Sequence, residues 1–254
     1  MGGSPAMVGA EVTKLRRRRS LMAVSVALTV GGVVMLYLVT GLQHLGDPVR
    51  HPAPGGSAGL DHAEQLLFYL AGFAGLSVGA TAGTADEDSG VFRDAVSTGR
   101  CRWALFAARI PGVLAVLVPL TLLALAIAIG GALLLPGTTV SAVVAAQESA
   151  AVLAVVVVNG LLALGLAPLI GARGLVIGLL AGAMQLSRML EQAGALGRVR
   201  LLLPTAGLDR LLPLSPGSQP RPVAVGVTVA LVVVTGWVLA ALVGGFWRTQ
   251  TRAA

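Results

Sequence analysis

Residues 141–170, SAVVAAQESAAVLAVVVVNGLLALGLAPLI, decide the fold class of this chain. Glu148 is the only charged residue in the run, which consists mostly of Ala, Val and Leu. A helix of about 20 apolar residues is long enough to cross the hydrocarbon core of a bilayer. The run is therefore expected to be a membrane span.

The composition of the whole chain agrees with a membrane protein. Of its 254 residues, 56% are hydrophobic and 11% are charged, and the mean hydropathy is +0.86. Charged residues make up about a quarter of an ordinary soluble domain. Six apolar helices would use more than half of the chain, which excludes a separate soluble catalytic domain. We expect an all-α, polytopic membrane protein with six transmembrane helices.

Apolar runs separated by polar segments predict where the spans begin and end. An N-terminal interface segment, 1–19, precedes a transmembrane domain over 20–247, and 248–254 forms a tail. The expected spans are 20–42, 63–85, 107–135, 141–170, 174–190 and 223–247. Residues 191–222 are rich in Arg, Leu and Pro, and they predict one or two short amphipathic turns at the outer interface.

The basic residues predict that both termini are cytoplasmic. With six spans, twelve of the 18 Lys and Arg residues lie on the side of the termini and six on the other side. Cytoplasmic loops carry the excess of Lys and Arg in membrane proteins, although five of the six exceptions cluster over 188–221. We therefore assign the net charge of +7 to topology and not to nucleic-acid binding. The dominance of Ala, Val, Gly and Arg suggests a bacterial plasma (inner) membrane.

Missing residues exclude several kinds of site. Lys14, the only lysine, does not stand in a GxxxxGK[ST] loop, so this chain is no P-loop ATPase. Cys101 is the only cysteine and can form neither an intramolecular disulfide nor a cysteine zinc site. His44, His51 and His62 lack the helical spacing of metal ligands, so no metal site is expected. No HExxH motif is present, and no catalytic site is expected.

Two of the expected spans carry glycines at a four-residue spacing. They are Gly75, Gly79 and Gly83 in the second span and Gly174, Gly178 and Gly182 in the fifth. Small residues at this spacing let two membrane helices approach closely. Helix packing is the predicted role, and chance spacing among 34 glycines is the alternative.

Polar side chains inside spans are the candidates for a substrate pathway, because each is costly in hydrocarbon unless it faces protein or water. The candidates are Glu148, Asn159 and Gln185. For Asn159 and Gln185 the alternative role is a hydrogen bond between helices. For Glu148 the alternative is a place at the outer interface.

The polar segment 86–103, DEDSGVFRDAVSTGRCRW, predicts a cytoplasmic amphipathic helix between the second and third spans. Acidic residues and Ser89 stand where a helix N-terminus takes caps and negative charge, and Gly99 stands where a helix ends. The apolar stripe consists of Val91, Phe92, Ala95 and Val96. Such a stripe needs a partner surface, either a protein groove or the lipid headgroups.

This segment resembles the loop after the second span in permeases of bacterial type-2 ABC exporters, the class that exports drugs, polysaccharides and lipids. The resemblance lies in an acidic cluster followed by Gly, a bulky residue and Arg, and then by Gly-Arg-x-Arg. The N-terminal segment 10–16, AEVTKLR, resembles the interface segment of the same family. Two features depart from the family pattern: the N-terminal segment is short, and Ser89-Gly90-Val91 replaces the more usual Gly-Thr pair.

The resemblance implies a permease subunit that exports its substrate by alternating access. Two separate ABC ATPase subunits would bind ATP and Mg and dock on a coupling helix over 88–99, and a second permease copy would complete a homodimer or heterodimer. No cofactor is expected in this chain. The coupling role carries over to Glu87, Gly90, Phe92, Arg93, Gly99 and Arg102, and the apolar stripe adds Val91 and Val96. The scarcity of charged residues in the spans favours a hydrophobic or amphipathic substrate.

Three other functions are compatible with the sequence. An ion-coupled secondary transporter would use Glu148 as its coupling acid. A non-transporting membrane protein would use the same amphipathic helix to regulate an ATPase. A membrane-embedded enzyme would need catalytic groups near the spans, and the sequence offers no recognisable set of them.

Overall fold

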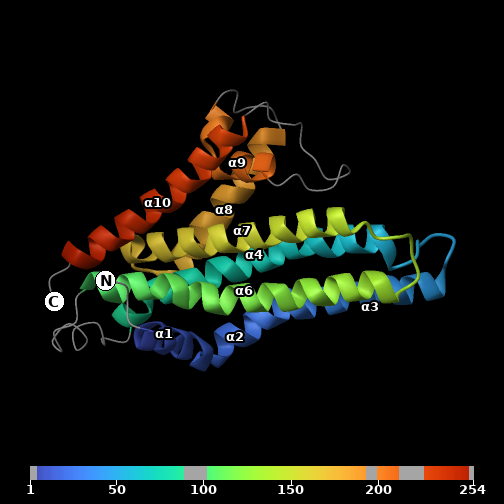
Figure 1. Ribbon diagram of the computed structural model, residues 1–254, viewed down its shortest axis with the longest axis horizontal. Coiled ribbons are helices and arrows are strands. Elements are labelled where there is room, and N and C mark those ends of the chain that lie inside the picture. Colours follow the sequence, from blue (N-terminus) through green and yellow to red (C-terminus); the bar gives the residue numbers. More distant parts are fainter. Residues whose placement is uncertain (1–4, 89–101, 193–198, 212–225, 252–254) are drawn as a thin grey trace.

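The computed structural model describes residues 5–88, 102–192, 199–211 and 226–251, and these residues form helices and turns without any strand (Figure 1). Five helical segments within them are long and apolar enough to cross a membrane. They are Arg19–Gly46, Gly56–Ala85, Arg102–Leu134, Ala142–Ile170 and Val227–Thr251. The chain is therefore an all-helical, multi-pass membrane protein.

The N-terminal part contains a short helix that is separate from the first span. Helix α1 (Pro5–Arg17) ends before Arg18, whose ψ of 80° interrupts the helix. The span follows as α2 (Arg19–Val26), a π-helical turn (Ala27–Gly31) and α3 (Gly32–Gly46). Leu15 of α1 is fully buried, and α1 packs on the first turns of the third long helix, α6 (Arg102–Leu134).

The second long helix, α4 (Gly56–Asp88), begins seven residues before the expected start of the second span at residue 63. A polar loop was expected to extend to His62, but only 47–55 lie between α3 and α4. The turn after α6 caps the additional helical residues. The Thr138 hydroxyl accepts the Ser57 N–H at 3.3 Å and lies 2.9 Å from the Ser57 hydroxyl. The Gly55 N–H also donates to the Pro136 carbonyl at 2.9 Å.

The C-terminal part comprises α7 (Ala142–Ile170), α8 (Arg173–Gln192), a 3-10 turn (Val199–Leu202), α9 (Pro204–Leu211) and α10 (Val227–Thr251). Gly171 ends α7 in the left-handed conformation at φ 76°, and its N–H donates to the Ala167 carbonyl at 2.8 Å. The expected fifth span, 174–190, coincides with α8, which is not among the five segments above. A sixth crossing stays a prediction.

The centre of the bundle is the contact between α4 and α7, which lie side by side (Figure 1). Gly75, Gly79 and Gly83 of α4 face this contact. A Cβ added at Gly75 would lie 2.7 Å from the Val156 carbonyl oxygen, and one at Gly79 would overlap the Gly160 carbonyl. At Gly83 an added Cβ would overlap the side chain of Ala167. The two helices are therefore in close contact over about two turns of α4. A larger side chain at any of the three glycines would push the helices apart.

Helices α7 and α10 also approach each other closely at glycines. A Cβ at Gly165 would overlap the backbone of Ala241, and one at Gly245 would overlap the Gly165 carbonyl. By contrast, Gly174, Gly178 and Gly182 of α8 have no atom within 4 Å of an added Cβ among the described residues. The two glycine series with the same spacing thus differ in their surroundings.

The α4–α7 contact predicts a large effect of a single methyl group. We expect Gly79→Ala to lower the free energy of unfolding by at least about 1–3 kcal/mol, because the helices must separate to admit the Cβ. Gly236→Ala on α10, where an added Cβ has no atom within 4 Å, is the control. It should leave stability unchanged or raise it slightly, because Ala favours helix over Gly. Thermal unfolding in detergent measures both, and equal effects would contradict the interpretation.

Candidate functional site: a cavity between four helices and two buried polar clusters

Most of the expected coupling residues lie outside the described part of the chain. Gly90, Val91, Phe92, Arg93, Val96 and Gly99 belong to the segment 89–101, of which the structure gives no description. Glu87 lies in the last turn of α4. Arg102 begins α6, and its guanidinium donates to the Gln250 carbonyl of α10 at 3.2 Å. The segment therefore leaves α4 and enters α6 at the end of the bundle where α10 finishes.

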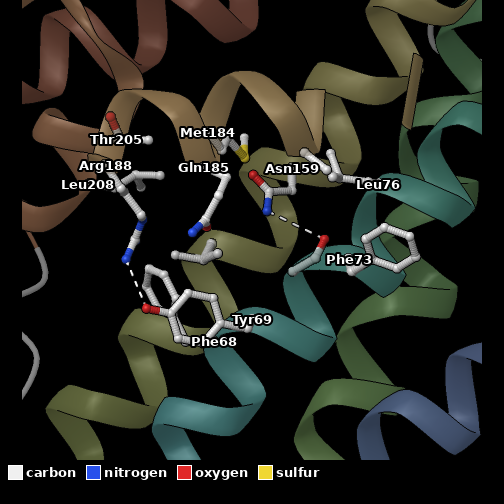
Figure 2. A pocket seen from close by; sticks show the side chains of 13 residues that line it. Phe68, Tyr69, Phe73, Leu76, Asn159, Met184, Gln185, Arg188, Thr205 and Leu208 are labelled. Carbon is white, nitrogen blue, oxygen red and sulfur yellow. Dashed lines mark hydrogen bonds between the residues drawn. The ribbon is translucent and has the colours of Figure 1, made fainter. Parts of the chain in front are cut away.

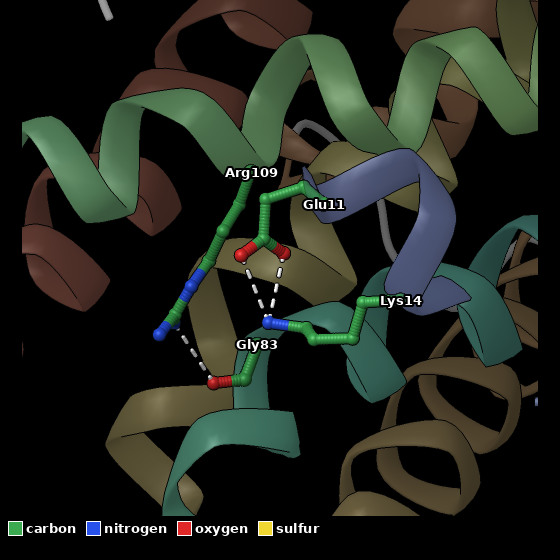
Figure 3. A network of polar contacts seen from close by, with 4 residues as sticks. All are labelled: Glu11, Lys14, Gly83 and Arg109. Atoms are coloured by element: carbon green, nitrogen blue, oxygen red, sulfur yellow. Dashed lines mark hydrogen bonds and ion pairs between the residues drawn. The ribbon is translucent and has the colours of Figure 1, made fainter. Parts of the chain in front are cut away.

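At this same end, α1 packs on α6, and polar contacts lie within α1 and between α6 and α4 (Figure 3). Lys14 Nζ lies 2.9 Å from both carboxylate oxygens of Glu11. Glu11 covers Gly112 of α6, where an added Cβ would lie 2.8 Å from the Glu11 Cβ. Arg109 of α6 is 2% exposed and donates to the Gly83 carbonyl of α4 at 3.2 Å. From the sequence, Arg109 is only one of the twelve basic residues expected on the cytoplasmic side, whereas the structure places it between α6 and α4.

Two of the three expected pathway residues line one cavity between α4, α7, α8 and α9 (Figure 2). The cavity measures about 190 Å³ and its lining is mostly apolar. Asn159 enters it from α7 and Gln185 from α8. The aromatic residues of the lining are Phe68, Tyr69 and Phe73, all from α4.

Asn159 fulfils only part of its hydrogen-bonding capacity within the described residues. Its Nδ2 donates to the Gly72 carbonyl of α4 at 3.4 Å, which is the interhelical hydrogen bond considered above. Its Oδ1 is buried without a hydrogen-bond donor there. A buried acceptor without a donor is unfavourable by about 1–3 kcal/mol. A ligand that brings a hydroxyl or N–H group into the cavity would remove this penalty.

Arg188 of α8 gives the cavity a charged edge. Its guanidinium carbon lies 4.8 Å from the ring centroid of Phe68 and 5.4 Å from that of Tyr69. The guanidinium also donates to the Tyr69 hydroxyl at 3.2 Å. Cation–π contacts of this kind contribute about 0.5–2 kcal/mol. They fix α8 beside α4 at the cavity.

A second, almost wholly apolar cavity of about 440 Å³ lies between α7, α8, α9 and α10. It shares Met184 and Thr205 with the first cavity, so the two adjoin. Trp237 lines the second cavity, and its indole N–H donates to the Leu202 carbonyl at 2.8 Å. The first cavity carries the side chains of Asn159, Gln185 and Arg188 in a mostly apolar lining, and the second adds almost wholly apolar space, a combination that suits an amphipathic molecule.

Glu148, the third expected pathway residue, does not line these cavities. It is 4% exposed on α7, next to Glu64 of α4, which is 1% exposed. The hydroxyl of Ser149 donates to Glu64 Oε1 at 2.8 Å. Sequence analysis missed Glu64 because it stands beside the expected start of the second span at residue 63, where acidic residues are common.

The histidines lie at the end of the bundle that carries Glu64. Nδ1 of His44 lies 2.8 Å from the His51 carbonyl oxygen, and Nδ1 of His62 lies 2.6 Å from that of Ala58. Among the described residues, no group of three or more His, Cys, Asp and Glu side chains is arranged to hold a metal ion.

Comparison with known proteins adds no relative: no protein-family model and no curated protein matches this chain.

The buried Arg109 predicts a stability effect at the α1 end of the bundle. We expect Arg109→Met to lower the free energy of unfolding by about 1–3 kcal/mol, because the Gly83 carbonyl loses its side-chain donor while the apolar volume is retained. Arg173→Met, at an exposed position at the start of α8, is the control and should change stability little. Chemical denaturation in mixed micelles measures both variants. An Arg109→Met protein as stable as the parent would contradict a structural role for Arg109.

Proposed function

We propose that this chain is the membrane-spanning permease subunit of an ATP-driven ABC exporter in a bacterial plasma membrane. The observation that carries the proposal is the gathering of four chain segments at one end of the bundle. These are α1, the end of α4, the start of α6 and the end of α10 (Figure 1). The segment 89–101, on which the family resemblance rests, connects two of them. An ATPase bound to that segment would act directly on α4 and α6.

A sixth crossing by α8 belongs to this proposal. The end of α7 lies beside the end of α4, because Gly83 packs on Ala167. Helix α10 begins near α9, far from the end of the bundle where α4 and α7 finish. It runs back to that end, where Gln250 contacts Arg102 of α6. Of the described segments between them, α8 is the long one, and its 20 residues correspond to about 30 Å, the thickness of the hydrocarbon core. With α8 as a span, both termini lie on the cytoplasmic side.

The proposed substrate is a hydrophobic or amphipathic molecule, and the two adjoining cavities support this choice. Alternating access requires that a central site open to one side of the membrane at a time. The first cavity lies between α4 and α7 on one side and α8 and α9 on the other. A tilt of α4 driven from the segment 89–101 would change the width of this cavity. The proposed ATPase subunits, two copies, supply ATP and Mg, and a second permease copy completes the complex.

Copurification tests the partner. A tagged chain extracted from its native host in mild detergent should bring down a P-loop ATPase, which mass spectrometry identifies. The triple variant Val91→Asp, Phe92→Asp, Val96→Asp should lose it, because charges on the apolar stripe oppose burial in a groove. Val49→Asp is the control: Val49 is 96% exposed in the turn between α3 and α4, at the other end of the bundle. Recovery of no ATPase with the parent chain would overturn the proposal.

Cysteine accessibility tests the number of crossings. In a Cys101→Ser background, single cysteines replace Thr13 on α1, Thr251 at the end of α10 and Thr138 in the turn after α6. With six crossings, a membrane-impermeant maleimide should label the cysteine at position 138 from outside intact cells. It should label the cysteines at positions 13 and 251 only after the membrane is opened. Labelling of Thr13 and Thr251 from opposite sides would establish five crossings and exclude α8 as a span.

A further inference from the structure

Two acidic side chains meet inside the α4–α7 interface, near the end that carries the turns 47–55 and 135–141. Glu64 of α4 is 1% exposed and Glu148 of α7 is 4% exposed. Both stand within segments long and apolar enough to cross a membrane. Ionisable residues in such segments are costly, and they commonly serve a proton or ion.

The contacts of Glu64 indicate that the two acids share a proton. Its Oε1 accepts the Ser149 hydroxyl at 2.8 Å, whereas its buried Oε2 has no donor among the described groups if both acids are ionised. The carboxyl group of Glu148 is its hydrogen-bond neighbour. An ionised carboxylate can only accept, so a hydrogen bond between two carboxyl groups requires that one of them be protonated.

The groups around the pair also favour the shared proton. Asp61, one turn earlier on α4, and Tyr37 of α3 interact electrostatically with Glu64. Neither is a cation, and the Tyr37 hydroxyl donates to the Ala128 carbonyl of α6 at 2.7 Å. Two negative charges here would repel each other in a medium of low dielectric constant.

We propose that Glu64 and Glu148 form a proton-binding site that controls this end of the α4–α7 interface. With one shared proton the carboxyl groups hold the helices together. When the proton leaves, two carboxylates face each other and push the helices apart. The glycine contacts at Gly75, Gly79 and Gly83 lie farther along α4, so the movement is confined to the end that carries Glu64.

Infrared spectroscopy tests the shared proton directly and without reference to any ATPase. The parent protein at neutral pH should show the C=O stretch of a protonated carboxyl group, and the band should vanish in the double variant Glu64→Gln, Glu148→Gln. If the double variant does not fold, the single variant Glu64→Gln replaces it in the test. This variant keeps one acid, Glu148, which should ionise at neutral pH, so the C=O band of the protonated carboxyl group should again be absent. Asp47→Asn, in the exposed turn after α3, is the control and should keep the band. Absence of the band from the parent protein, or its persistence in the Gln variants, would overturn the proposal.

Distance measurements test the movement. Spin labels at Ala58 and Val143, both exposed near the starts of α4 and α7, should move apart as the pH rises from about 6 to about 10. Thermal stability should fall over the same range, because two carboxylates then repel each other inside the interface. In Glu148→Gln the amide N–H₂ donates to Glu64 without a titrating proton, so distance and stability should both lose their pH dependence. A parent protein whose label distance is unchanged over this range would refute the control of the interface.

Discussion

The close approach of α4 and α7 is the constraint on which the rest of the structure depends. Two helices whose backbones touch at Gly75 and Gly79 gain van der Waals contact along several turns, which is the main source of helix association where lipid competes for apolar side chains. Helix α7 repeats the arrangement towards α10 at Gly165. The same two helices carry Asn159 and the aromatic wall of the cavity. The position of the cavity therefore follows from glycines that are not part of its lining.

The two walls of the cavity are held by different kinds of contact. The α4–α7 wall rests on backbone contacts that no rotamer change can relax. The α8 wall is attached near the cavity by the contacts of Arg188 with Phe68 and Tyr69, and by a Ser187–Thr205 hydroxyl contact of 3.2 Å with α9. Side-chain contacts of this kind can break and re-form at low cost. In the proposed transport cycle, α4 tilts together with α7, and the side-chain contacts of α8 with α4 break and re-form as the cavity changes its width.

The sequence predicted the all-helical membrane fold and the approximate positions of its long helices, because hydropathy is a local property. It did not predict that α4 begins at Gly56, since the cap comes from Thr138, 81 residues later. The same limit applies to the glycines: their spacing is identical in α4 and α8, yet only those of α4 meet a neighbour within the described chain. Asn159 and Gln185 were predicted as candidates one by one, whereas their sharing of one cavity required the packing of four helices. The pairing of Glu64 with Glu148 likewise depends on how α4 and α7 pack, which the sequence alone does not give.

The two ends of α4 differ in what their contacts require. At one end, the contact is a hydrogen bond from the buried Arg109 of α6 to the Gly83 carbonyl. At the other end, the contact between Glu64 and Glu148 depends on a proton that the solvent can remove. A rigid helix of 33 residues joins them. A tilt of α4 imposed at the segment 89–101 would therefore also move Glu64, and the acid pair is where we propose that the α4–α7 interface can open. With the proton bound to the Glu64–Glu148 pair, a tilt of α4 would carry α7 with it. Without the proton, the same tilt would separate the two helices at this end.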